Sequence, residues 1–217
     1  MKNEPGPQVV VFSLGPVQTN CFLVFDPESR ECVVIDPAWE GERLADEVSQ
    51  RSLALTSVLV THAHFDHIGG CAALVARHPA PIYLHPADQP LWSVDGGASF
   101  FGIEIEPLPP TGPAFEDGMH LHCGALDFEV LHLPGHTPGH VGLLESAHGW
   151  LFSGDVLFAG SIGRADLPGG DYATLMASIR NRLLPLPDST LVYSGHGPET
   201  TIGRERRSNP FITGGWG

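Results

Sequence analysis

The segment Thr61–His67, with the sequence T-H-A-H-F-D-H, concentrates residues that can bind a metal ion. It places three histidines and one aspartate within six positions, directly after the apolar run Leu53–Val60. Imidazole and carboxylate groups are ligands that zinc and related metals accept. A polar loop that happens to be rich in histidine is the alternative interpretation of this segment taken alone.

Three further candidate ligands, His136, Asp155 and His196, lie downstream in a similar local setting. Each follows a short apolar segment typical of a strand and adjoins a glycine, which permits a tight turn. The strand-like segments are 128–133, 149–152 and 190–193. Side chains at strand ends are held more rigidly than side chains on mobile loops. Together with the first motif, these placements predict a metal centre.

The T-H-A-H-F-D-H motif, followed in order by His136, Asp155 and His196, resembles the metallo-β-lactamase superfamily. The resemblance implies an α/β fold, a four-layer αβ/βα sandwich, as a single domain over residues 1–217. It places the metal cleft along one edge of two packed sheets. It also implies two metal sites, formed by His62, His64 and His136 for the first, Asp66, His67 and His196 for the second, and Asp155 as the bridge between them.

Details of the sequence narrow the choice within this superfamily. Asp155 stands where true β-lactamases carry a cysteine, which argues against β-lactam hydrolysis. His64 stands where flavodiiron proteins have a glutamate, and 217 residues leave no room for the inserted domains of the family's nucleases. From about Val9 to Phe211 the chain resembles the short bacterial glyoxalase II-like hydrolases, in the segments 134–140, 153–158, 163–166 and 203–211.

This resemblance implies hydrolysis of a small 2-hydroxyacyl thioester such as S-lactoylglutathione. Two divalent metal ions are expected, zinc first, with iron or manganese as alternatives. A water that bridges two metals loses its proton near neutral pH, and the hydroxide attacks the thioester carbonyl. Asp66 and Asp155 are the expected catalytic carboxylates. The chain is too short for the C-terminal helical domain with which full-length glyoxalase II binds glutathione, so the thiol carrier is left open.

Two other functions are compatible with the motif. A persulfide dioxygenase of the same fold uses a single iron on two histidines and one aspartate, and Gly163–Pro168 resembles that class as much as the hydrolases. His140 favours the hydrolase, because the dioxygenases tend to carry another residue there. A non-catalytic metal-binding module is the third alternative, and the complete set of seven ligands argues against it.

Three residues are predicted to contact the substrate. Arg164 follows the bridging Asp155 closely and is expected at the cleft rim, where a guanidinium fork would bind a carboxylate of the thiol carrier. Arg206 is a second candidate, with an ion pair to Glu205 or another acid as its alternative. His140 would orient either the ligand shell or a substrate oxygen, and a core role is equally compatible with its position.

Composition limits the partners and the compartment. A net charge of −14 argues against nucleic acid, and no stretch approaches the ~20 apolar residues of a membrane span. The N-terminus lacks the apolar core of a signal peptide. Four cysteines without C-x-x-C spacing indicate reduced thiols in a cytoplasmic protein. The expected partner is a small-molecule thioester, and the sequence does not define the oligomeric state.

The spacing of apolar residues predicts the elements around the site. Strands are expected at 9–14, 20–25 and 31–35, and helices at 40–51, 68–77 and 172–184. Residues 86–117 are rich in proline, glycine and aromatic residues, including Trp92, Phe100 and Phe101. Long segments of this kind are often functional, so a lid or pocket wall is favoured there over a plain surface connection.

Overall fold

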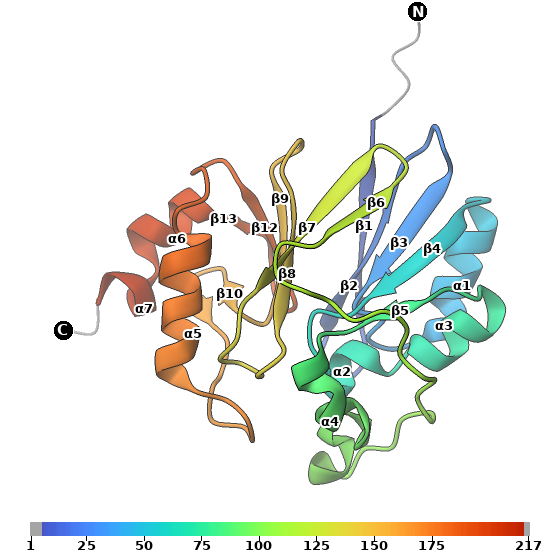
Figure 1. Ribbon diagram of the computed structural model, residues 1–217, viewed down its shortest axis with the longest axis horizontal. Coiled ribbons are helices and arrows are strands. Elements are labelled where there is room, and N and C mark those ends of the chain that lie inside the picture. The colour runs from blue at the N-terminus through green and yellow to red at the C-terminus, as the bar shows by residue number, and fades with distance from the viewer. Residues whose placement is uncertain (1–5, 215–217) are drawn as a thin grey trace, which may run out of the picture.

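Short apolar strands build two β-sheets that face each other in the computed structural model, which describes residues 6–214 (Figure 1). The first sheet begins with an antiparallel meander, as the sequence predicts, and continues with two parallel strands. Parallel strands need long connections, and here these contain helices. The strand order is β1 (Gln8–Leu14), β2 (Thr19–Phe25), β3 (Glu31–Ile35), β4 (Ala54–Leu59) and β5 (Ile82–Tyr83).

The second sheet is antiparallel except where β12 runs parallel to β9. A separate two-stranded hairpin of β10 (Leu157–Phe158) and β11 (Ser161–Ile162) follows β9. The order in the second sheet is β13 (Thr200–Thr201), β12 (Leu191–Ser194), β9 (Trp150–Gly154), β8 (Val141–Glu145), β7 (Leu126–His132) and β6 (His120–Cys123).

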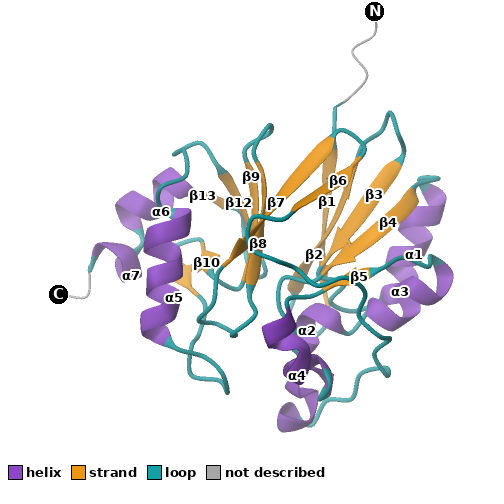
Figure 2. Ribbon diagram, viewed as in Figure 1, coloured by secondary structure: helices purple, strands orange, loops and turns teal. Residues whose placement is uncertain are grey.

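Helices cover the outer face of each sheet, as Figure 2 shows. The expected helix 68–77 is present as two short helices around Gly69 and Gly70, because the metal loop itself coils before the longer helix begins. The helices on the first sheet are α1 (Gly41–Gln50) and α3 (Cys71–Arg77), while α2 (Phe65–Ile68) lies in the metal loop at the end of this sheet, beside α4 (Gln89–Trp92). Those on the second are α5 (Tyr172–Ser178) with the π-type turn η3 (Ile179–Leu183), α6 (Ile202–Ser208) and α7 (Pro210–Thr213).

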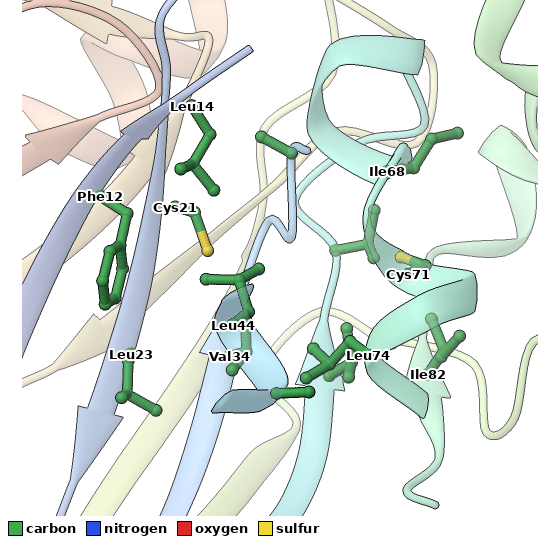
Figure 3. Packing of buried hydrophobic residues seen from close by; sticks show 14 of the residues in the cluster. Phe12, Leu14, Cys21, Leu23, Val34, Leu44, Ile68, Cys71, Leu74 and Ile82 are labelled. Atoms are coloured by element: carbon green, nitrogen blue, oxygen red, sulfur yellow. The ribbon is translucent and has the colours of Figure 1, made fainter. Parts of the chain in front are cut away.

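Three apolar cores separate four layers and establish the predicted sandwich. One core joins α1 and α3 to the first sheet, with Leu44 and Leu74 among its buried residues (Figure 3). A second fills the space between the sheets, where the rings of Phe22 and Phe152 meet edge to face with centroids 5.2 Å apart. The third joins the second sheet to the C-terminal helices, with Leu175 fully buried.

Residues 86–117 contain three short helices and then an extended stretch. The helices are η1 (Pro86–Asp88), α4 (Gln89–Trp92) and η2 (Asp95–Phe101). Gly96, at φ 63°, lies so close to the metal loop that a Cβ atom there would be 2.3 Å from the backbone nitrogen of Phe65. Glycine is required at this position both for the left-handed backbone and for the close approach. The segment is thereby fixed against the metal loop.

Among the described residues, no helix has the length and apolar character needed to cross a membrane.

Candidate metal centre

The predicted ligands converge at one edge of the sandwich, where strands of both sheets end. β4 leads into His62 and His64, and α2 carries Asp66 and His67. His136, Asp155 and His196 follow β7, β9 and β12. The two sheets also meet here directly, since Thr19 forms a β-bridge with His196. The chain therefore brings all seven predicted ligands together from both halves of the fold.

His62, His64 and His136 form the first triad, whose ligand atoms all lie within 4.8 Å of one another. Nδ1 of His64 is 2.9 Å from Nε2 of His136. Nε2 of His62 is buried and has no hydrogen-bond partner among the described residues. A buried polar atom without a partner is costly in an apolar surrounding, and a metal ion would satisfy it.

Asp66, His67 and His196 form the second triad. Oδ2 of Asp66 lies 3.6 Å from Nε2 of His67 and 3.3 Å from Nε2 of His196. Nitrogen and oxygen ligands about 2.0–2.2 Å from one zinc ion are roughly 3.3–3.6 Å apart in a tetrahedron. These two distances therefore fit ligands of a common metal ion.

Asp155 lies between the two triads. Its Oδ1 is 3.4 Å from Nε2 of His67, and its Oδ2 is 3.7 Å from Nε2 of His136 and 3.5 Å from Nε2 of His196. Gly195 makes this position possible, because a Cβ atom there would be 2.2 Å from the Asp155 carboxylate. One carboxylate thus faces ligands of both sites, which is the arrangement expected of a bridge.

Hydrogen bonds on the far side of the histidine rings point the free nitrogens at the site. Nδ1 of His67 is 3.0 Å from Oδ2 of Asp36, and Nδ1 of His136 is 2.7 Å from the carbonyl oxygen of Arg164. Nδ1 of His62 lies 3.1 Å from the hydroxyl of Thr61. When these Nδ1 atoms carry the proton, Nε2 is left as the ligand.

The charges around the site fit a cation. Burial and neighbouring imidazoles lower the pKa of His64 to about 3, so this ring is neutral at pH 7 and its lone pair is available. Burial raises the pKa of Asp66, but the His67 charge and the hydrogen bonds from His196 and Thr19 together outweigh this effect and lower it to about 2. Burial disfavours a charge on His196, yet the hydrogen bonds that its ring donates to Asp155 and Asp66 raise its pKa to about 9. The carboxylates therefore hold positive charge at the second site.

Two buried carboxylates that were not predicted from the sequence support the ligand loops. Asp36 accepts hydrogen bonds from the backbone nitrogen and hydroxyl of Thr61, besides its contact with His67. Asp88 accepts from the backbone nitrogens of Ala63 and Gly139 and from the hydroxyl of Thr137. Asp88 thus ties the loop of His62 and His64 to the loop of His136.

Asp36 could have been found by the signal that identified the ligands, because it directly follows the apolar strand β3. Asp88 lies in the proline-rich segment without a strand pattern. Its partners are mostly backbone groups distant in the sequence, and a pattern of side chains cannot predict such contacts.

The predicted substrate role of His140 is not supported by its placement. The ring is fully buried and stacks on His62 with centroids 4.8 Å apart. Its Nε2 accepts a hydrogen bond from the backbone nitrogen of Asp155, at 3.0 Å. A substrate has no access to a ring in this position. His140 instead positions Asp155 and His62, in agreement with the alternative that it orients the ligand shell.

The two predicted arginines differ in their contacts. Arg164 supports the first triad through its backbone, and its half-exposed side chain donates two hydrogen bonds of 2.8 Å to Asp166. Arg206 pairs with Asp188 and donates to the carbonyl oxygens of Leu184 and Leu186. The contacts of Arg206 are those of the ion-pair alternative, with Asp188 as the acid, and they give no support to a substrate role for Arg206.

Comparison with known proteins agrees with the fold and the ligand set. The sequence profile of the Metallo-beta-lactamase superfamily matches residues 14–196. The chain belongs to this superfamily. It is 43% identical over 207 residues to the hydroxyacylglutathione hydrolase GloC of Haemophilus influenzae, with 94% of this chain and 97% of the relative covered.

Two solved structures resemble the whole chain. The B3 metallo-beta-lactamase BLEG-1 is 41% identical with a TM-score of 0.89, covering 95% of this chain and 100% of that one. TTHA1623 in a di-iron-bound form is 46% identical with a TM-score of 0.86, covering 94% of this chain and 100% of that one. The two relatives differ by name, since the first is called a B3 metallo-beta-lactamase and the second holds two iron ions.

Proposed function

We propose that the protein is a binuclear metal-dependent hydrolase of small thioesters, with 2-hydroxyacyl thioesters such as S-lactoylglutathione as the leading substrates. The observation that carries the proposal is the pair of ligand triads sharing the Asp155 carboxylate. The similarity to GloC supports this substrate class. A mononuclear iron dioxygenase would need only two histidines and one aspartate, and would leave the remaining ligands of the set without a role.

Two divalent metals held by these ligands supply, when bound, a hydroxide nucleophile near neutral pH and polarise the carbonyl oxygen. The chain's own residues hold the carboxylates in place. The Thr19 hydroxyl donates to Oδ2 of Asp66 at 2.9 Å, which holds this carboxylate beside His67 and His196. The leaving thiolate needs no strong protein acid, because thiols have a low pKa.

Covalent catalysis by a cysteine is disfavoured by the state of the thiols. All four cysteines are buried and free of disulfides. Burial raises the pKa of Cys32 and Cys123 to about 12, and it raises the pKa of Cys21 and Cys71 well above the ordinary value. A protonated buried thiol is a poor nucleophile. Reduced thiols also support our placement of the protein in the cytoplasm.

We keep zinc as the first metal to test, with iron and manganese next. Imidazole ligands suit both zinc and iron, and carboxylates accept each of the three. The di-iron-bound relative supports testing iron on an equal footing.

Hydrolysis of a β-lactam is a second candidate function, favoured by the similarity to BLEG-1. A strained cyclic amide presents a carbonyl carbon to the same nucleophile. It differs from a thioester in its amine leaving group, which has to gain a proton.

The test compares one preparation, loaded in turn with zinc, iron or manganese, on three substrates. Thiol release from S-lactoylglutathione, ring opening of a chromogenic cephalosporin and oxygen uptake with glutathione persulfide are followed in parallel. We expect the thioester activity to dominate and to disappear on chelation. Oxygen uptake without thioester cleavage would establish the dioxygenase alternative, and silence in all three assays would leave a binding module.

A further inference from the structure

An apolar pocket adjoins the first metal triad. It has a volume of about 260 Å³ and includes His64, which is itself a predicted ligand. Apart from that imidazole, every lining residue is apolar or glycine. Five come from the segment 86–117 and two from the loop after β11: Leu91, Gly96, Gly97, Phe100, Phe101, Leu167 and Pro168. A group bound in this pocket would therefore lie directly beside the reacting carbonyl.

The pocket is built from the segment that contains η2, and two aromatic residues of this segment remain uncovered. Phe100 is 78% exposed and Phe101 is 52% exposed. The Phe101 ring contacts that of Phe65 in the metal loop, with centroids 5.2 Å apart. Large apolar side chains that gather at a pocket beside a reactive centre mark a surface for a ligand to cover.

The lining of this pocket offers no lysine or arginine side chain. His64 is the lining residue with a polar side chain, and as a predicted ligand it would be committed to the metal. The basic residue closest in sequence to Leu167 is Arg164, whose guanidinium forms an ion pair with Asp166. A carboxylate seated among these apolar side chains would lose its hydration without a hydrogen-bond donor from them. The apolar lining thus disfavours the charged ends of a carrier such as glutathione.

We infer that this pocket binds an uncharged, apolar group of the thioester, carried on either its acyl or its thiol side. The inference rests on the proposed function, and it gives the 86–117 segment the role of a specificity wall. The substrate class becomes thioesters with an apolar substituent next to the scissile bond, rather than thioesters recognised chiefly by charge.

Two substrate series separate the acyl side from the thiol side. The first joins acetyl, butyryl and hexanoyl groups to N-acetylcysteamine, and the second joins an acetyl group to ethanethiol, butanethiol and hexanethiol. Each kcat/KM is divided by the rate constant for cleavage by free hydroxide, which removes differences in intrinsic reactivity. In the series whose group enters the pocket, burial of each methylene is expected to raise this normalised kcat/KM roughly fourfold. Succinyl-N-acetylcysteamine, which carries a carboxylate, is expected to react more slowly than the butyryl compound.

Variants of the wall test whether the pocket causes the preference. Phe101→Ala is expected to reduce the gain per methylene in the responsive series, and Leu167→Ala gives an independent second variant from the loop after β11. Tyr172→Ala is the matched control, because Tyr172 is an aromatic residue with a similar exposure of 56% that does not line the pocket. It should leave the gain unchanged.

The outcomes separate this inference from the proposed function. If thioesters are cleaved at rates that do not depend on apolar length in either series, or if the succinyl compound is preferred, the inference is wrong and the proposed function stands. A gain that persists in both Phe101→Ala and Leu167→Ala also rejects it. If metal-loaded protein cleaves no thioester at all, the proposed function fails and the inference with it.

Discussion

The two metal triads are held by different physical means. The first consists of three buried imidazoles, and its loops are tied together by the hydrogen bonds of Asp88. The second contains a carboxylate, is stabilised by charge, and includes His196, whose side chain is 30% exposed. A site preorganised by packing keeps its geometry when one contact changes, whereas an exposed site held by charge loses its ion more readily. We therefore expect the second metal to exchange faster than the first.

The largest effect is expected from the carboxylate that both sites share. Asp155→Ala should deplete both metals and reduce thioester cleavage to the level of chelated protein, because ligands of both triads face this side chain. Elemental analysis and steady-state kinetics measure the two effects. Asp127→Ala, which removes an exposed carboxylate on β7, is the control and should retain nearly two metals. Retention of both metals in Asp155→Ala would contradict a bridging role.

The second prediction separates the triads. His196→Ala should mainly empty the second site and leave nearly one metal per chain, since the buried first triad is intact. His64→Ala should instead impair the first site. In native protein we expect nearly two metals about 3.5–4 Å apart. Cobalt substitution followed by optical titration distinguishes the occupied sites in each variant. A single tightly bound iron in native protein, with no second site on titration, would overturn the binuclear centre.

The third prediction concerns the support of the first triad. Asp88→Asn should lower the free energy of unfolding of metal-free protein by about 3 kcal/mol, because an amide NH₂ would face buried donors that lose their acceptor. Metal affinity should fall by roughly 10–100-fold. Urea denaturation and metal competition measure these changes. Asp95→Asn alters an exposed aspartate of the same segment and serves as the control. Unchanged stability and affinity would show that the loops do not depend on Asp88.

The contrast between ligands and supports explains what the sequence could predict. His62, His136 and Asp155 follow strand-like segments, so local pattern and family resemblance identified them together. Asp88 acts through backbone groups that only the tertiary structure brings near. The opening strands were predicted to within a residue or two because their apolar runs are clearly bounded by turns.

The apolar pocket and the supporting role of His140 could not be predicted from residue types alone, because both depend on tertiary contacts. The aromatic character of residues 86–117 indicated a functional segment, but the position of Phe101 beside the metal loop follows from the close approach of Gly96. The sequence left His140 open between a support of the ligand shell, a substrate contact and a core residue, and its burial is what argues against the substrate contact.

The smallest predicted effect lies at the rim of the first triad, at Arg164. Its backbone carbonyl holds His136, and its side chain points outward to Asp166, so Arg164→Gln should leave the metal site intact. We expect KM for S-lactoylglutathione to rise by about threefold with kcat nearly unchanged, because an exposed charge contact is worth only about 0.2–1 kcal/mol and is made equally in ground and transition states. Lactoyl-N-acetylcysteamine lacks the carboxylates of glutathione, and its KM should not change. Asp166→Asn frees the guanidinium and should lower KM for the glutathione thioester alone. If Arg164→Gln raises KM equally for both thioesters, or for neither, the arginine does not bind the carboxylates of the thiol carrier.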